Sequence, residues 1–163
     1  MQGSIRSLFS DQGDAFAEVS RSARQAEILI ETISPLIEAF TSAACRLCTT
    51  VCCINRHSRF DHSDVIFMTA LGKDIPEEDP GIADTDACRF LGMRGCVRKR
   101  SQRPYRCTWF FCEALMDQIM QQASSAEYRK FIEMLQDITK NRIAMIRDFE
   151  TISSRLYSCR KMP

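Results

Sequence analysis

Apolar residues recur at steps of three and four over the first third of the chain. The positions that follow this spacing are Phe16, Val19, Ala23, Ala26, Ile30, Ile33, Ile37, Phe40 and Ala44. The spacing predicts a helical segment with one buried face over about residues 12–44. Pro35 interrupts the stripe and Ser34 can cap a helix, so the segment is either two helices in near register or one kinked helix.

The last third of the chain repeats this pattern. Its apolar positions are Tyr128, Phe131, Leu135, Ile138, Met145, Phe149, Ile152 and Leu156, with Arg142 in one slot of the stripe. Ser124 followed by Glu127 is typical of a capping box, which predicts a helix start near Ser125 and a shorter helix from about Trp109 to Gln122 before it. The two stripes are expected to bury each other in an antiparallel bundle. Stripes of this length also leave open a coiled-coil homodimer or another protein partner along the helical arms.

Helix breakers gather between these two segments, at Gly72, Pro76, Pro80, Gly81, Gly92, Gly95 and Pro104. The predicted fold is therefore mainly α, with antiparallel helical arms that bracket an irregular, cysteine-rich, metal-binding middle segment. A length of 163 residues fits a single domain over 1–163. Within it we expect an N-terminal arm over 12–44, the cysteine region over 45–112 and a C-terminal arm over 113–158.

Charge and hydropathy narrow the class of protein. The net charge is +1 at pH 7, so bulk charge does not point to nucleic acid as a partner. No apolar run approaches the roughly 18 residues that a membrane helix needs, and the first residues show no secretory signal. We therefore expect a soluble, cytoplasmic protein that does not bind a membrane.

The sequence contains nine cysteines, and in a reducing compartment such thiols bind metals or catalyse rather than form structural disulfides. Eight of them fall into two groups of four, which are Cys45, Cys48, Cys52 and Cys53, and then Cys88, Cys96, Cys107 and Cys112. Cysteines with two residues between them, such as Cys45 and Cys48, can direct both sulfurs at one ion about 2.3 Å away. The eight are predicted metal ligands, whereas Cys159 is expected to be a free thiol.

Other side chains near these cysteines have simpler explanations. His57 and His62 lie within reach, since Cys53 to His57 is one helical turn, but the eight thiols already fill two tetrahedral sites. Arg89, Arg94, Arg98, Lys99, Arg100, Arg103 and Arg106 form a basic strip that is read as a solvated face or as charge balance for thiolates. Trp109, Phe110 and Phe111 are expected to shield the metal site from water. Residues 73–86 are expected to be a solvated connector.

The cysteine pattern resembles that of the YkgJ-like cysteine-cluster family, a zinc- or iron-chelating domain with a CxxCxxCC signature. Cys45 to Cys53 resemble the signature with one extra residue between Cys48 and Cys52, and Cys88–Leu91, Gly95–Cys96 and Arg103–Cys107 resemble its later elements. The resemblance implies metal chelation over residues 45–112 and no particular reaction. Relatives that resemble flagellin lysine N-methylases are enzymes, but this chain has no glycine loop for a methyl donor.

These observations predict a metal-binding protein that chelates zinc, slightly favoured, or an iron–sulfur cluster, in a structural or accessory role. The sequence shows no catalytic constellation such as a nucleophile elbow or HExxH. One alternative is an iron–sulfur redox enzyme or a methyltransferase-related accessory protein. A second is a nucleic-acid-binding zinc module that uses residues 98–106, although nucleic acid is not the expected partner.

Overall fold

The computed structural model describes residues 2–45, 52–93 and 95–160. Within them the chain is mainly helical, as the sequence predicts. The helices are α1 (Gln2–Asp11), α2 (Ala17–Ala44), α3 (His62–Ala70), α4 (Arg106–Trp109), α5 (Glu113–Gln122) and α6 (Ser125–Arg160). Short 3-10 turns cover Gly13–Phe16, Asn55–Ser58 and Arg100–Gln102, and strands β1 (Leu91–Gly92) and β2 (Gly95–Cys96) pair as an antiparallel hairpin.

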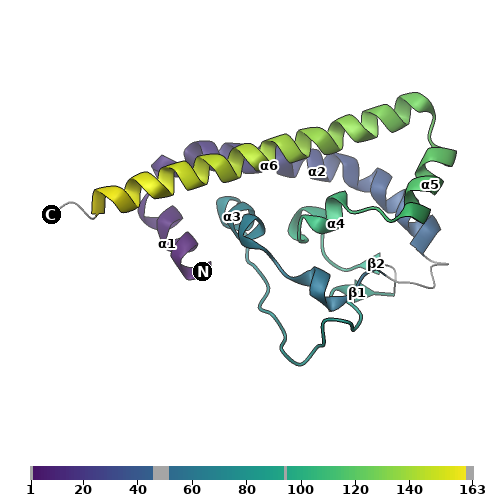
Figure 1. Cartoon of the computed structure of the whole chain (residues 1–163), viewed down its shortest axis with the longest axis horizontal. Coiled ribbons are helices and arrows are strands. Elements are labelled where there is room, and N and C mark those ends of the chain that lie inside the picture. The colour runs from purple at the N-terminus through teal and green to yellow at the C-terminus, as the bar shows by residue number, and fades with distance from the viewer. Residues whose placement is uncertain (1, 46–51, 94, 161–163) are drawn as a thin grey trace.

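The two longest helices, α2 and α6, lie side by side (Figure 1). Phe16, directly before α2, packs against Phe149 late in α6, with ring centres 5.4 Å apart. Near the other end of α2, Phe40 meets Phe131 early in α6 edge-on at 6.2 Å. The two helices therefore run in opposite directions. In Figure 1, α1, α3, α4 and the β1–β2 hairpin lie along one side of this pair.

The apolar stripe predicted for α2 is buried. From Phe16 to Phe40 its members are at most 8% exposed, and the side chain of Ala44 lies outside the described part of the chain. α2 is one continuous helix with Pro35 inside it, so the alternative of two helices with a cap at Ser34 is wrong. Ile33 and Ile37, each 1% exposed, flank Pro35. Their packing stabilises the helix across the backbone hydrogen bond that proline cannot donate.

α6 begins at Ser125, as its capping box predicts. The N–H of Ser124 donates to the Glu127 carboxylate at 2.9 Å, and the Ser124 hydroxyl accepts from the N–H of Glu127 at 3.3 Å. The Ser124 hydroxyl, which donates to the same carboxylate at 2.7 Å, and the Ser124 N–H both lower the pKa of Glu127. The stripe that follows is buried at Phe131, Ile138, Met145 and Phe149.

The helix predicted from about Trp109 to Gln122 is shorter in the structure. Trp109 ends α4 and α5 begins only at Glu113, because Phe110 and Cys112 have extended backbone angles. The break places the cysteine-bearing α4 on a separate turn from α5.

Helices α1 and α3 are not predicted by the sequence pattern. Because α3 lies in the middle of the chain, that region is not irregular throughout. α1 buries Ile5 and Leu8. In α3 the residues from Val65 to Met68 are all at most 2% exposed, and a run that is buried on every side has no helical period to detect. Asp61 starts α3, and its carboxylate accepts the N–H of Asp64 at 2.9 Å.

Arg142, the polar residue within the α6 stripe, is buried because α3 supplies a counter-charge. Its Nη2 donates to Oδ1 of Asp64 at 2.8 Å, and its guanidinium lies over the rings of Phe67 at 4.7 Å and Tyr105 at 4.3 Å. The same Asp64 oxygen accepts the N–H of Tyr105 at 3.0 Å. The pair therefore joins α3, α6 and the segment that leads to Cys107.

None of the helices in residues 2–45, 52–93 and 95–160 combines the length and the apolar character needed to cross a membrane.

Candidate metal centre

Cys53 and Cys88 are brought together by a short backbone pairing. The N–H of Cys88 donates to the carbonyl of Cys53 at 2.8 Å, and Ile54 and Ala87 form an antiparallel bridge. The buried side chain of Asn55 extends this pairing, because its amide donates to the carbonyl of Ile82 at 2.9 Å. The end of the predicted solvated connector is therefore bound to the segment that follows Cys53, although most of the connector is exposed.

Cys96 reaches the same region through the β1–β2 hairpin. Leu91 pairs with Cys96 in the strand register, and the N–H of Val97 donates to the carbonyl of Phe90 at 2.9 Å. Gly95 has a φ of 105°, a conformation that favours glycine. A side chain on Gly92 would lie 2.9 Å from Val97, so glycine is required there for close packing. The two glycines thus make the tight hairpin that returns Cys96 toward Cys88.

The segment that carries Cys107 is fixed to α2 by a buried arginine. Nη1 of Arg100 donates to the carbonyl of Cys107 at 2.6 Å, and its Nη2 donates to Oε1 of Glu38 at 2.6 Å. Arg103 donates to the same Glu38 oxygen at 3.0 Å. The Arg100 side chain is 3% exposed and the Glu38 side chain 46% exposed. One carboxylate of α2 therefore anchors the loop before α4.

Replacing Glu38 by glutamine is expected to lower the free energy of unfolding by about 2 kcal/mol, because Arg100 keeps a buried charge without its counter-charge. This expected loss of stability is smaller than that from breaking a fully buried ion pair, because the Glu38 side chain is partly exposed. Urea unfolding measures this change in the free energy of unfolding. The control is Glu31→Gln on an exposed position of the same helix, for which we expect a change within about 0.5 kcal/mol. Equal losses in the two variants would contradict this account of Glu38.

The thiols of Cys53 and Cys107 lie near several other thiols. Burial raises the pKa of Cys53, the thiols of Cys52, Cys88, Cys45 and Cys96 raise it as well, and together these effects bring it to about 11. At neutral pH this thiol is therefore protonated when no metal is bound.

Cys107 interacts with members of the same group. Burial and the thiols of Cys96, Cys53 and Cys88 raise the pKa of Cys107, and the charge of Arg103 lowers it; the net result is a pKa of about 12. The four thiols of Cys53, Cys88, Cys96 and Cys107 thus come from separate segments, and Cys88 and Cys96 each raise the pKa of both Cys53 and Cys107. A cation bound among them would offset their mutual repulsion.

The remaining predicted ligands are placed differently. Cys45 follows the end of α2 and contributes to the pKa of Cys53, whereas Cys48 lies outside the described residues. Cys112, directly before α5, packs against the hydrophobic core, so its role as an eighth ligand stays a prediction. Over residues 2–45, 52–93 and 95–160, no three His, Cys, Asp or Glu side chains converge closely enough to hold a metal ion. Cys53, Cys88, Cys96 and Cys107 therefore lie in one region, but the described residues form no coordination shell there.

The two histidines have other partners. Nδ1 of His57 lies 2.9 Å from the carbonyl of Cys52, and its Nε2 accepts from Nε of Arg56 at 3.2 Å. Cys53 and His57 do not lie on one helical turn, since Ile54 is extended. The ring of His62 contacts Phe149 edge-on at 6.3 Å. Both nitrogens of His57 are therefore engaged away from the thiols.

Comparisons of this chain with protein families, with curated proteins and with solved structures found no match. The resemblance to the YkgJ-like family stays a prediction.

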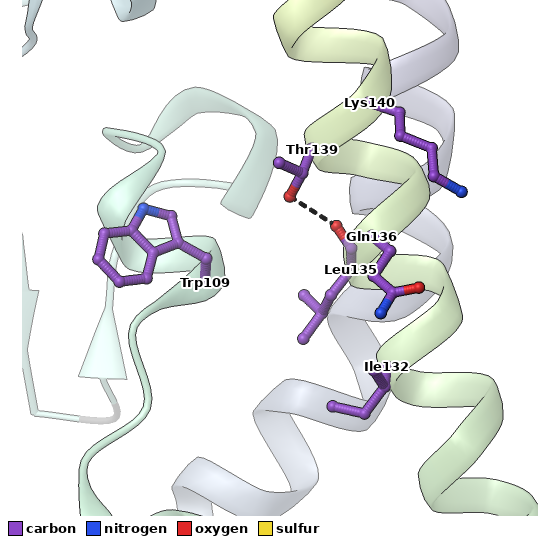
Figure 2. A pocket seen from close by; sticks show the side chains of 6 residues that line it. All are labelled: Trp109, Ile132, Leu135, Gln136, Thr139 and Lys140. Atoms are coloured by element: carbon purple, nitrogen blue, oxygen red, sulfur yellow. Dashed lines mark hydrogen bonds between the residues drawn. The ribbon is translucent and has the colours of Figure 1, made fainter.

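The aromatic run after Cys107 does not form a continuous shield. Trp109 and residues of α6 line a shallow apolar hollow of about 420 Å³. In Figure 2 the indole of Trp109 extends from its backbone away from α6. The hollow is lined by Trp109, Ile132, Leu135, Gln136, Thr139 and Lys140. Trp109 is 47% exposed, while Phe111 packs against Phe131 in the core. The three rings thus have different surroundings: Trp109 is at the surface and Phe111 is in the core. The Phe110 ring lies under the guanidinium of Arg106, 4.2 Å from its centre.

The basic strip is not a uniformly solvated face. Arg100 is buried and, with Arg103, is paired to Glu38, a carboxylate that is distant in the sequence. Lys99 is exposed, and Arg94 lies outside the described residues. Two of the strip's seven cations therefore stabilise the loop that carries Cys107, which leaves fewer of them to contact phosphates.

Proposed function

We propose that this chain is a metal-binding protein that chelates zinc or an iron–sulfur centre through clustered cysteine thiolates, in a structural or accessory role. The observation that carries the proposal is the grouping of Cys53, Cys88, Cys96 and Cys107. Thiolates are preferred ligands of zinc and of iron–sulfur clusters. The other predicted ligands, Cys45, Cys48, Cys52 and Cys112, would complete this site or form a second one.

The environment of the thiols favours metal binding over nucleophilic or redox catalysis. A reactive cysteine needs a lowered pKa, whereas burial and neighbouring thiols raise those of Cys53 and Cys107. A bound cation reverses this effect because it stabilises each thiolate that contacts it.

The helices serve as the scaffold in this proposal. α2 and α6 would act as arms that bracket the cysteine-rich middle, which is the arrangement predicted from the two apolar stripes. The thiols of the described residues are near each other but do not converge, so metal binding is expected to draw Cys53, Cys88, Cys96 and Cys107 closer together.

Titration of the reduced, metal-free chain tests the proposal. With a chromophoric chelator as competitor, we expect uptake of about one or two zinc ions per chain, as four or eight thiolates can hold. Iron and sulfide are offered to a second sample without oxygen, and a broad absorption near about 400 nm would select the iron–sulfur form. The control is the same chain with its thiols alkylated. Uptake that survives alkylation, or no uptake of either metal, would contradict the proposal.

A further inference from the structure

A polar cavity of about 460 Å³ lies between the turn after Cys53, the loop over residues 77–81 and Arg89. Its polar and charged lining residues are Asn55, Ser58, Arg59, Glu78, Asp79 and Arg89. The volume falls in the range of small-molecule sites in proteins. Among the described residues that line the cavity there is no cysteine, so it is separate from the proposed metal centre.

One wall of the cavity is fixed by its own hydrogen bonds. Asn55 and Ser58 are 5% and 2% exposed, and the Ser58 hydroxyl donates to Oδ1 of Asn55 at 3.1 Å. The amide of Asn55 donates in turn to the carbonyl of Ile82 at 2.9 Å. These polar groups satisfy each other, so this wall keeps its shape without a ligand.

Arg89 has one edge that is not used. Its Nη1 donates to the carbonyl of Glu77, and its guanidinium lies over the Phe90 ring, 4.6 Å from the ring centre. Nε and Nη2 are buried and have no hydrogen-bond partner among the described residues. Buried donors of a charged group are costly to leave without acceptors. These two atoms form one edge of the guanidinium, and such an edge can bind both oxygens of a carboxylate.

The other charges of the cavity narrow the kind of anion. Arg59 is paired with Asp84, so its charge is already balanced. Glu78 and Asp79 are exposed, and in the described part of the chain neither of them forms an ion pair. Their carboxylates would repel a dianion such as phosphate. A ligand that carries an ammonium group as well as a carboxylate would match both signs of charge.

We propose that this cavity binds a small zwitterion of the amino-acid class. The carboxylate of the ligand accepts from Nε and Nη2 of Arg89, and its ammonium group faces Glu78 and Asp79. The ligand supplies the acceptor that the buried donors of Arg89 lack.

Access to Arg89 depends on the loop over residues 77–81. These residues are exposed and contain no helix or strand. Segments with few buried contacts open at a small cost in free energy. A movement of this loop therefore admits the ligand to Nε and Nη2, which protein atoms cover in its absence.

Isothermal titration calorimetry on the full chain as purified tests this inference. The probes are the standard amino acids other than cysteine and histidine, because those two chelate metals themselves. We expect at least one to bind with a Kd below about 1 mM. Its methyl ester lacks the carboxylate and its N-acetyl form lacks the ammonium group, so each is expected to bind at least about tenfold more weakly. No binding of any amino acid up to about 10 mM, or tighter binding of inorganic phosphate, would overturn the inference.

Arg89→Gln is expected to weaken binding of that amino acid at least about tenfold, because two charge-assisted hydrogen bonds are lost. The matched control is Arg98→Gln. Arg98 lies over the same Phe90 ring, 5.3 Å from its centre, but does not line the cavity, so we expect a change of less than about twofold. Circular dichroism verifies the helix content of both variants. Equal losses in the two variants would overturn the role of Arg89.

Glu78→Gln tests the contact with the ammonium group at an exposed residue, where the change does not threaten the fold. This variant is expected to lower the preference for the amino acid over its N-acetyl form at least about threefold. An unchanged preference would overturn the assignment of a zwitterion.

The inference does not depend on the proposed metal centre. A chain that takes up metal but binds no amino acid would overturn the amino-acid site alone. A chain that binds an amino acid but no metal would overturn the proposed function alone.

Discussion

Replacing Arg142 by methionine is expected to lower the free energy of unfolding by about 3 to 5 kcal/mol, because it leaves Asp64 buried without its counter-charge. The two side chains are 3% and 5% exposed and joined at 2.8 Å. Burial raises the pKa of Asp64 and lowers that of Arg142, and each charge opposes the shift of the other. For a chain of this size the loss corresponds to a melting temperature lower by roughly 10 °C, which calorimetry measures.

A second substitution tests whether the unpaired charge causes this loss. Asp64→Asn removes the charge but keeps one oxygen that can accept the N–H of Tyr105, so the double variant with Arg142→Met is expected to recover part of the stability. The control is Arg147→Met, since the Arg147 side chain is 71% exposed and, within the described part of the chain, pairs with no carboxylate other than that of its neighbour Asp148. A control that lost as much stability as Arg142→Met would contradict this explanation.

The largest expected effect on metal binding comes from Cys107→Ser. Zinc sites of four thiolates bind with a total of roughly 10 to 16 kcal/mol, so the loss of one ligand is expected to weaken zinc binding about a hundredfold. Cys107 is chosen because it interacts with Cys96, Cys53 and Cys88, which belong to separate segments. Chelator competition on the reduced chain measures the change.

Cys159→Ser is the matched control for this variant. Cys159 lies near the end of α6, a long helix, and has no partner in either cysteine group of the sequence. The same chemical change at this position, outside both cysteine groups, is expected to leave zinc affinity within about twofold. Equal effects of Cys107→Ser and Cys159→Ser would show that binding does not depend on the cluster.

The helical arms could be predicted because each buries one face of a periodic sequence. The stripes from Phe16 to Phe40 and from Phe131 to Phe149 repeat at helical spacing, and the side chains of Ser124 and Glu127 mark the start of α6. α3 could not be predicted in this way, because its apolar run is continuous and buried on every side. The run therefore shows no helical periodicity of apolar and polar positions.

The surroundings of the cysteines could be predicted less well, because they depend on contacts between distant segments. The eight thiols were visible as two groups in the sequence, but no local pattern links Glu38 to Arg100 or Asp64 to Arg142. Arg142 looked like an interruption of a stripe, and Arg100 like part of a solvated face. Their partners lie on α3 and α2, and spacing along one helix carries no information about a partner on another.

The most direct test of the central claim is the metal content and ultraviolet–visible spectrum of the chain purified without oxygen. We predict either about one or two zinc ions per chain in a colourless sample, or iron and sulfide with a broad absorption near about 400 nm. Either result would support a metal centre built from the clustered cysteines and would decide its type. A folded, reduced chain that contains no metal and takes up neither zinc nor an iron–sulfur cluster would contradict the claim.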